Sequence, residues 1–159
     1  MTDQDDIQTT PVHVTTVPLR WSDFDRYGHM NNAAYIELAQ EARVKFARDE
    51  FLGRGLDVPT VFVRRLEIDY LRPVLPDTTA EVVVETVVTQ FGRTSFTTRQ
   101  QIKDHLGNVA CVIDCVQVAI DMSTANPREI TATERKVLTQ AGAEVEGGDA
   151  EGGEAEGGE

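Results

Sequence analysis

The residues best suited to do chemistry gather in one segment near the N-terminus, Trp21-Ser22-Asp23-Phe24-Asp25-Arg26-Tyr27-Gly28-His29-Met30-Asn31-Asn32. The segment holds two carboxylates, an imidazole and two carboxamides, and it directly precedes a predicted long helix. A helix N-terminus has unpaired backbone N–H groups and partial positive charge, so it can stabilise a developing oxyanion. A carboxylate held nearby can act as nucleophile or general base. These are the groups that acyl transfer needs.

Each of these side chains also has a structural interpretation. Asp23 and Asp25 suit turns and caps, Asn31 and Asn32 suit a helix N-cap, and His29 can be an ordinary loop histidine. The two aspartates and the histidine could ligate a metal, but no second cluster completes a site, so we predict neither a metal nor a cofactor. The chain also lacks a Gly-x-Ser-x-Gly elbow and a phosphate-binding glycine loop.

Hydrophobic patterning predicts the elements that position this segment. Residues 12–21 are rich in β-branched side chains, which predicts a strand. The apolar residues of 32–52 recur at spacings of three and four, which predicts an amphipathic helix. Gly53 and Gly55 would end this helix. Strands and one short helix follow, over residues 61–71, 79–90, 94–103, 109–121 and, for the helix, 131–140. The third and fourth of these segments should pair as a hairpin around residues 105–108.

This order predicts an α+β fold, with a curved antiparallel sheet packed around one long helix, because no second helix separates the later strands. Alternation along the strand after the helix places Phe62, Leu66, Ile68 and Tyr70 largely on one face. The strand over 109–121 is apolar on both faces, which predicts cover on both sides.

The two cysteines, Cys111 and Cys115, fall in that last strand. Side chains four residues apart along a strand are too distant to form a disulfide. We therefore expect two buried free thiols in a protein of the reducing cytoplasm.

The formal charge of −12 is concentrated in the two terminal segments. Ten acidic residues lie in 1–6 and 144–159, which contain no Lys or Arg, so residues 7–143 carry about −2. We expect a flexible segment over 1–11, one domain over 12–140, and a disordered acidic Gly/Glu-rich tail over 141–159. No basic block favours nucleic acid as a partner, and no apolar run is long enough for membrane insertion or a secretory signal.

The same segments closely resemble the 4-hydroxybenzoyl-CoA thioesterase family of hotdog-fold proteins. The resemblance covers about residues 14–125. It rests on the motif Trp21 to Asn32, on Tyr35 and Glu41-Ala42-Arg43 in the helix, on Phe62-Val63-Arg64-Arg65, Ile68-Asp69-Tyr70 and Arg72-Pro73, and on Gly92-Arg93-Thr94-Ser95.

This resemblance implies an acyl-CoA or acyl-carrier-protein thioesterase that needs no cofactor and works as a homodimer or homotetramer, with active sites between subunits. The family's key aspartate falls on Asp25, as nucleophile or general base. Its oxyanion donor falls at the backbone N–H of Asn32, and His29 is the third candidate catalytic residue. We also expect a set of substrate-binding residues, Gly28, Asn31, Arg93, Thr94 and Ser95. The resemblance places a basic residue such as Arg93 near the CoA phosphates, and a surface ion pair is the alternative for Arg93.

Two other functional classes stay open at this point. A hydratase-type or dehydratase hotdog protein would use a similar architecture with a different arrangement of histidine and acid. A non-catalytic acyl-CoA-binding protein would keep the fold without the reaction. The presence of Asp25 followed by Gly28 favours hydrolysis.

Overall fold

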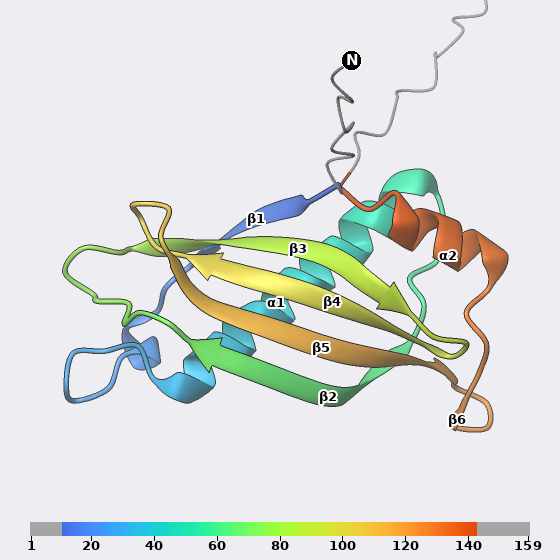
Figure 1. Cartoon of the computed structure of the whole chain (residues 1–159), viewed down its shortest axis with the longest axis horizontal. Coiled ribbons are helices and arrows are strands. Elements are labelled where there is room, and N and C mark those ends of the chain that lie inside the picture. Colours follow the sequence, from blue (N-terminus) through green and yellow to red (C-terminus); the bar gives the residue numbers. More distant parts are fainter. Residues whose placement is uncertain (1–10, 143–159) are drawn as a thin grey trace, which may run out of the picture.

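The structure, a computed structural model, describes residues 11–142 and consists of one long helix lying along a curled antiparallel sheet (Figure 1). Short 3-10 turns cover Trp21–Asp23 and Leu52–Arg54. The strands are β1 (His13–Pro18), β2 (Val61–Tyr70), β3 (Glu81–Phe91), β4 (Ser95–Lys103), β5 (Val109–Asp121) and β6 (Asn126–Pro127), and the helices are α1 (Asn32–Phe51) and α2 (Ala132–Thr139). The predicted α+β architecture is confirmed.

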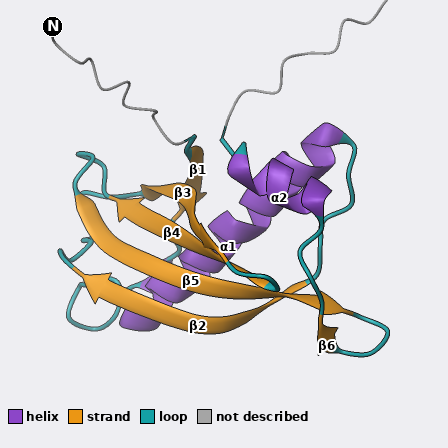
Figure 2. Cartoon of the chain, turned by 45° about the vertical axis from the view of Figure 1, so that its right-hand side comes forward, coloured by secondary structure: helices purple, strands orange, loops and turns teal. Residues whose placement is uncertain are grey.

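The sheet has the order β1-β3-β4-β5-β2, with β6 added to β5. All neighbouring strands are antiparallel. Helix α1 crosses one face of this sheet, and α2 lies beyond the end of the sheet near the C-terminal end of α1 (Figure 2). Within the described residues, β1 and β2 are therefore the two edges of the main sheet.

The main core forms where α1 meets the sheet. Leu38, Ala39 and Ala42 of α1 are fully buried against strand residues that include Ile102 and Ile113. The small side chains let the helix approach the sheet closely, and each fully buried Leu or Ile contributes about 1.5–3 kcal/mol relative to exposure.

Both helices begin with local caps. The side chain of Asn31 accepts a hydrogen bond from the N–H of Ala33, which confirms the first of the two predicted caps for α1. Gly55 has φ 72°, a left-handed conformation that favours glycine and stops the helical turn after α1. In α2, Thr131 and Glu134 form a capping box.

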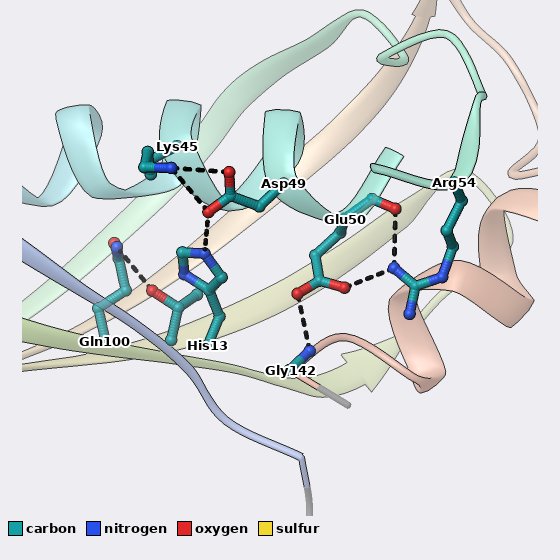
Figure 3. Close-up of polar contacts among 8 residues, drawn as sticks. His13, Lys45, Asp49, Glu50, Arg54, Gln100 and Gly142 are labelled. Carbon is teal, nitrogen blue, oxygen red and sulfur yellow. Dashed lines mark hydrogen bonds and ion pairs between the residues drawn. The ribbon is translucent and has the colours of Figure 1, made fainter. Parts of the chain in front are cut away.

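The C-terminal end of α1 holds the end of the described chain. The buried carboxylate of Glu50 accepts hydrogen bonds from Arg54 Nη1 (2.6 Å) and from the N–H of Gly142 (2.8 Å), as Figure 3 shows. Ala141 is also buried in the second core cluster. The folded chain thus continues two residues past the predicted boundary at 140, and the remainder of the predicted tail lies outside the described residues.

The start of the described chain is held by Asp49, the residue before Glu50 in α1. His13 Nε2 lies 2.8 Å from Asp49 Oδ2, and Lys45 binds the same carboxylate (Figure 3). This contact ties β1, an edge strand, to α1. Of the predicted flexible segment 1–11, residues 1–10 lie outside the described part of the chain.

One prediction about the face of β2 is wrong. A register shift between Val63 and Arg65 places Phe62 opposite Val118, whereas Leu66 lies opposite Cys115. Directly opposed residues share a face, and Val118 and Cys115 are on opposite faces of β5. The bulge therefore turns Phe62 away from the helix, where it is 52% exposed.

The prediction that β5 is buried on both faces is confirmed in part. Cys111, Ile113 and Cys115 are fully buried on the helix side. On the other face Val118 and Ile120 are buried, while Val112 and Val116 are half-buried. Both cysteines are free thiols, as predicted. Burial raises the pKa of Cys111 to about 12 and also raises the pKa of Cys115.

Candidate active site

The segment singled out in the sequence forms a tight loop that ends at the first residue of α1. Phe24 and Met30 pair as an isolated antiparallel bridge, and the N–H of Asp25 donates to the carbonyl oxygen of His29 (2.8 Å). The loop reverses at Gly28, whose φ of 76° favours glycine. These contacts fix the backbone of Asp25 and of His29 in one small unit.

Asp25 is half-buried and is fixed through one of its two oxygens. Its Oδ1 accepts hydrogen bonds from the N–H groups of Tyr27 (2.8 Å) and His29 (3.2 Å). Among residues 11–142 no group donates to Oδ2. One oxygen positions the carboxylate and the other is available for a reactant.

Asp23 has a different environment, which the sequence alone could not distinguish. It is 2% exposed, and it accepts hydrogen bonds from the N–H of Arg20 (2.7 Å) and from Arg20 Nη2 (3.0 Å). Its carbonyl oxygen accepts from the N–H of Asn31 (2.7 Å). Asp23 therefore stabilises the loop, with both carboxylate oxygens in use.

Asn32 supplies the backbone of the first helical residue. Within the described part of the chain its N–H makes no hydrogen bond, because Asn31 caps Ala33 instead. The carbonyl oxygen of Asn32 accepts a hydrogen bond from the hydroxyl of Tyr70 (2.9 Å), at the end of β2. A free N–H at a helix start can polarise a carbonyl oxygen or hold an oxyanion.

A cleft of about 210 Å³ opens beside this loop. It is lined by His29, Asn32, Tyr70 and Arg72, among others, and His29 is exposed at its rim. Tyr35 forms the inner wall as the expected core residue, 3% exposed, with its hydroxyl accepting from the N–H of Val74 (3.3 Å). No sequence pattern indicates that Tyr70 would reach the helix start.

The structure does not bring Arg93, Thr94 and Ser95 to this cleft. Ser95 lies opposite Val118 of β5, whereas Tyr70, beside Asn32, lies opposite Cys111. Seven residues of strand separate these positions, about 23 Å. Arg93 forms the surface ion pair that was one of its two predicted outcomes, with Glu129 at 2.5 Å.

A second, larger cleft of about 480 Å³ lies between the C-terminal half of α1 and the first half of β2. Its floor includes the buried polar side chains of Arg43 and Gln117. The exposed carboxylate of Glu41 lies 3.8 Å from Arg20 and lines a separate hollow on α1. Sequence reasoning did not find this cleft, because its two walls come from segments about twenty residues apart.

Two further properties of the described residues concern metal binding and membrane spanning. Within 11–142, no three His, Cys, Asp or Glu side chains are grouped so that they could hold a metal ion. No helix in this part of the chain is long and apolar enough to cross a membrane.

The architecture and the loop define a hotdog-fold protein, and comparisons with known proteins place it further. The model of the thioesterase-like superfamily matches residues 19–140, so the chain belongs to that superfamily and is a thioester hydrolase. A search of curated proteins finds no match. The resemblance to hotdog thioesterases is confirmed, and membership in the 4-hydroxybenzoyl-CoA family within them stays a prediction.

Solved structures agree on the fold. A thioesterase from Thermus thermophilus, complexed with coenzyme A and zinc, has a TM-score of 0.71 and 25% identity, over 87% of this chain and 99% of that one. YbaW, a probable thioesterase from Escherichia coli, has a TM-score of 0.68 and 26% identity, over 80% and 97%. A predicted thioesterase from Bacillus stearothermophilus, 23% identical over 82% and 96%, has a TM-score of 0.71.

Proposed function

We propose that the protein hydrolyses acyl-CoA or acyl-carrier-protein thioesters to a carboxylic acid and a thiol, with Asp25 as the catalytic residue. The observation that supports this most directly is that Asp25 Oδ2 and the N–H of Asn32, at the two ends of one short loop, both lack a hydrogen-bond partner among the described residues. The coenzyme A bound by the Thermus thermophilus thioesterase is consistent with a CoA substrate.

In this mechanism the thioester carbonyl oxygen accepts a hydrogen bond from the N–H of Asn32, at the positive end of the α1 dipole. Asp25 Oδ2 then either attacks the carbonyl carbon, giving a mixed anhydride and a thiolate, or takes a proton from the attacking water. His29, at the rim of the cleft, orients the water or the leaving group. Gly28 and Asn31 shape the loop that receives the substrate.

We also propose that the working unit is a homodimer or a homotetramer. Edge strand β2 exposes apolar side chains beside the helix, with Val63 49% exposed and Val44 of α1 48% exposed. A long exposed edge of this kind presents unpaired N–H and C=O groups on which the strand of another chain can pair. A second copy paired at β2 would also offer a route by which Arg93, Thr94 and Ser95 of one subunit approach the CoA bound at the other.

The cytoplasm is the compartment we propose, since Cys111 and Cys115 are buried free thiols in β5.

The rival functions are tested by the same assay as the main one. Purified protein is given short, long and aromatic acyl-CoAs and acyl-carrier-protein thioesters, and free thiol is followed. Hydrolysis that survives EDTA is expected. Tight binding without thiol release would favour the non-catalytic acyl-CoA-binding alternative, and water addition to an enoyl-CoA would favour the hydratase-type alternative.

A further inference from the structure

Arg43 is a charged side chain inside the core. It is 7% exposed, and its one hydrogen bond among residues 11–142 runs from Nη1 to Gln100 Oε1 (2.8 Å). None of the ion pairs of the described residues includes it, and burial lowers its pKa. A guanidinium has five N–H donors, and a buried cation without an anion is costly. Nε and Nη2 of Arg43 make no hydrogen bond to the described residues, and neither atom is fully buried, so both are accessible from the cleft that Arg43 lines.

The surroundings of Arg43 hold it in place on a polar floor. Gln100 donates through Nε2 to Thr86 Oγ1 (3.2 Å) and to a backbone carbonyl of α1, which turns its oxygen toward Arg43. Gln117 donates through Nε2 to Thr98 Oγ1 (3.3 Å), and among the described residues nothing donates to its carbonyl oxygen. These four uncharged side chains lie on the face of the sheet that covers α1.

Arg43 and Gln117 open into the cleft of about 480 Å³ between α1 and β2. The walls around this floor are mostly apolar, with Val44, Ala47, Leu52, Val58, Val61 and Val63 among them. Because Val44 and Val63 also belong to the surface that we propose a second copy covers, the cleft would lie at the subunit interface of that dimer. Apolar walls with a few fixed polar groups are the usual composition of a small-molecule site.

The cleft lies at a definite distance from the proposed reaction centre. Asn32 and Arg43 are eleven residues apart on one helix, which is about 16 Å. Gln40 and Val44 line this cleft and also a second hollow beside Glu37, nearer the helix start. A chain attached at the carbonyl and running along α1 would reach Arg43 only if it is of medium or greater length.

We propose that the cleft binds the far part of the acyl chain, and that Arg43 selects chains that carry an oxygen acceptor there, as a carboxylate or a hydroxyl. This inference rests on the proposed thioesterase function and names its substrate class. A carboxylate would supply the missing counter-charge, and a hydroxyl would accept from Arg43 and donate to Gln117. A plain hydrocarbon would displace water from the guanidinium of Arg43 without offering it an acceptor, so such a chain would bind less well.

The first test compares three substrates of one length on the wild-type protein: dodecanoyl-CoA, 12-hydroxydodecanoyl-CoA and dodecanedioyl-CoA. We expect kcat/KM to be about tenfold or more higher for at least one oxygenated chain, and the higher of the two distinguishes hydroxyl from carboxylate. Equal or better hydrolysis of dodecanoyl-CoA overturns the inference and leaves the proposed function standing. Absence of hydrolysis for every thioester removes both.

The second test compares Arg43→Met with Arg48→Met, since Arg48 is an exposed cation lining the same cleft. The preference for the oxygenated chain should collapse in Arg43→Met and largely persist in Arg48→Met. Circular dichroism and sedimentation are measured on both, and a loss of the oligomer in Arg43→Met with the preference intact would assign Arg43 to subunit contact and overturn the inference.

Ala47→Phe keeps the proposal testable if Arg43→Met does not fold. The added ring would fill the cleft and should lower kcat/KM for dodecanedioyl-CoA relative to butanoyl-CoA by about tenfold or more. An unchanged ratio would show that the acyl chain lies elsewhere.

Discussion

The hydroxyl of Tyr70 donates a hydrogen bond to the carbonyl oxygen of Asn32 at 2.9 Å, joining the end of β2 to the first residue of α1. The ring of Tyr70 also packs edge-on against Tyr35, with centroids 5.2 Å apart. The side chain of Tyr70 therefore positions the end of β2 against the first residue of α1. In the proposed mechanism, the placement of the Asn32 N–H depends on this contact.

The first prediction follows from this bond. Tyr70→Phe keeps the ring contact and removes the donor, so we expect kcat to fall several-fold with a small change in melting temperature, because a partly exposed neutral hydrogen bond contributes only about 0.5–1.5 kcal/mol. Thiol release and thermal unfolding are measured on the same sample. A fall in stability with unchanged kcat would mean that Tyr70 only packs the fold.

The helices and strands of this fold can be predicted from the sequence, but their exact ends and the contacts between them are harder to predict. Apolar spacing predicts α1 and the hairpin of β4 and β5 because each pattern repeats over several turns or residue pairs. The bulge near Arg64 is a single extra residue with no sign in the composition, so the face of Phe62 is wrongly predicted.

The candidate site also has a part that the sequence predicts and a part that it does not. Asp25, His29 and Asn32 are found together because they are neighbours in the chain. The separation of Arg93 from them depends on sheet order, and the cleft at Arg43 depends on the approach of β2 to α1. Such long-range relationships are not encoded in any local pattern.

The second prediction concerns the two cysteines. Because burial raises the pKa of Cys111 to about 12, and also that of Cys115, both thiols stay protonated at pH 8. Iodoacetamide should leave the folded protein unmodified and fully active, and it should alkylate both thiols in denaturant. Mass spectrometry after timed quenching checks this. Rapid alkylation of the folded protein with loss of turnover would place a thiol in the active site.

The third prediction compares two glycines near the ends of α1 and α2. Gly142 has φ 90°, and an added Cβ would collide with the backbone of Val12. Gly142→Ala should therefore lower the free energy of unfolding by more than the roughly 1–2 kcal/mol that a left-handed alanine costs. Gly53→Ala has open space, so it should stabilise by about 0.4–1 kcal/mol. Urea titrations measure both, and equal effects would contradict the contact at Val12.

The fourth prediction concerns assembly. If β2 is covered by a second copy, Val63→Lys on that exposed strand should shift the protein from an oligomer toward a 17.6 kDa monomer, because a charge would then be buried at the interface. Sedimentation at several concentrations measures the shift. Met122→Lys, at an exposed position outside β2, is the matched control. A fully active wild-type monomer would exclude the proposed dimeric site.

The last prediction separates the two aspartates of the loop. Asp25→Asn keeps the side-chain size but removes the charge and the reactive character of Oδ2, so kcat should fall by about 10²-fold or more, with a smaller change in KM. Asp23→Asn disturbs a buried carboxylate that Arg20 holds, so it should lower the melting temperature while the folded fraction keeps most of its kcat. Both variants are assayed on one acyl-CoA, with circular dichroism to establish folding. If folded Asp25→Asn turns over normally and folded Asp23→Asn is inactive, then the chemistry belongs to Asp23, and the free oxygen of Asp25 has no catalytic role.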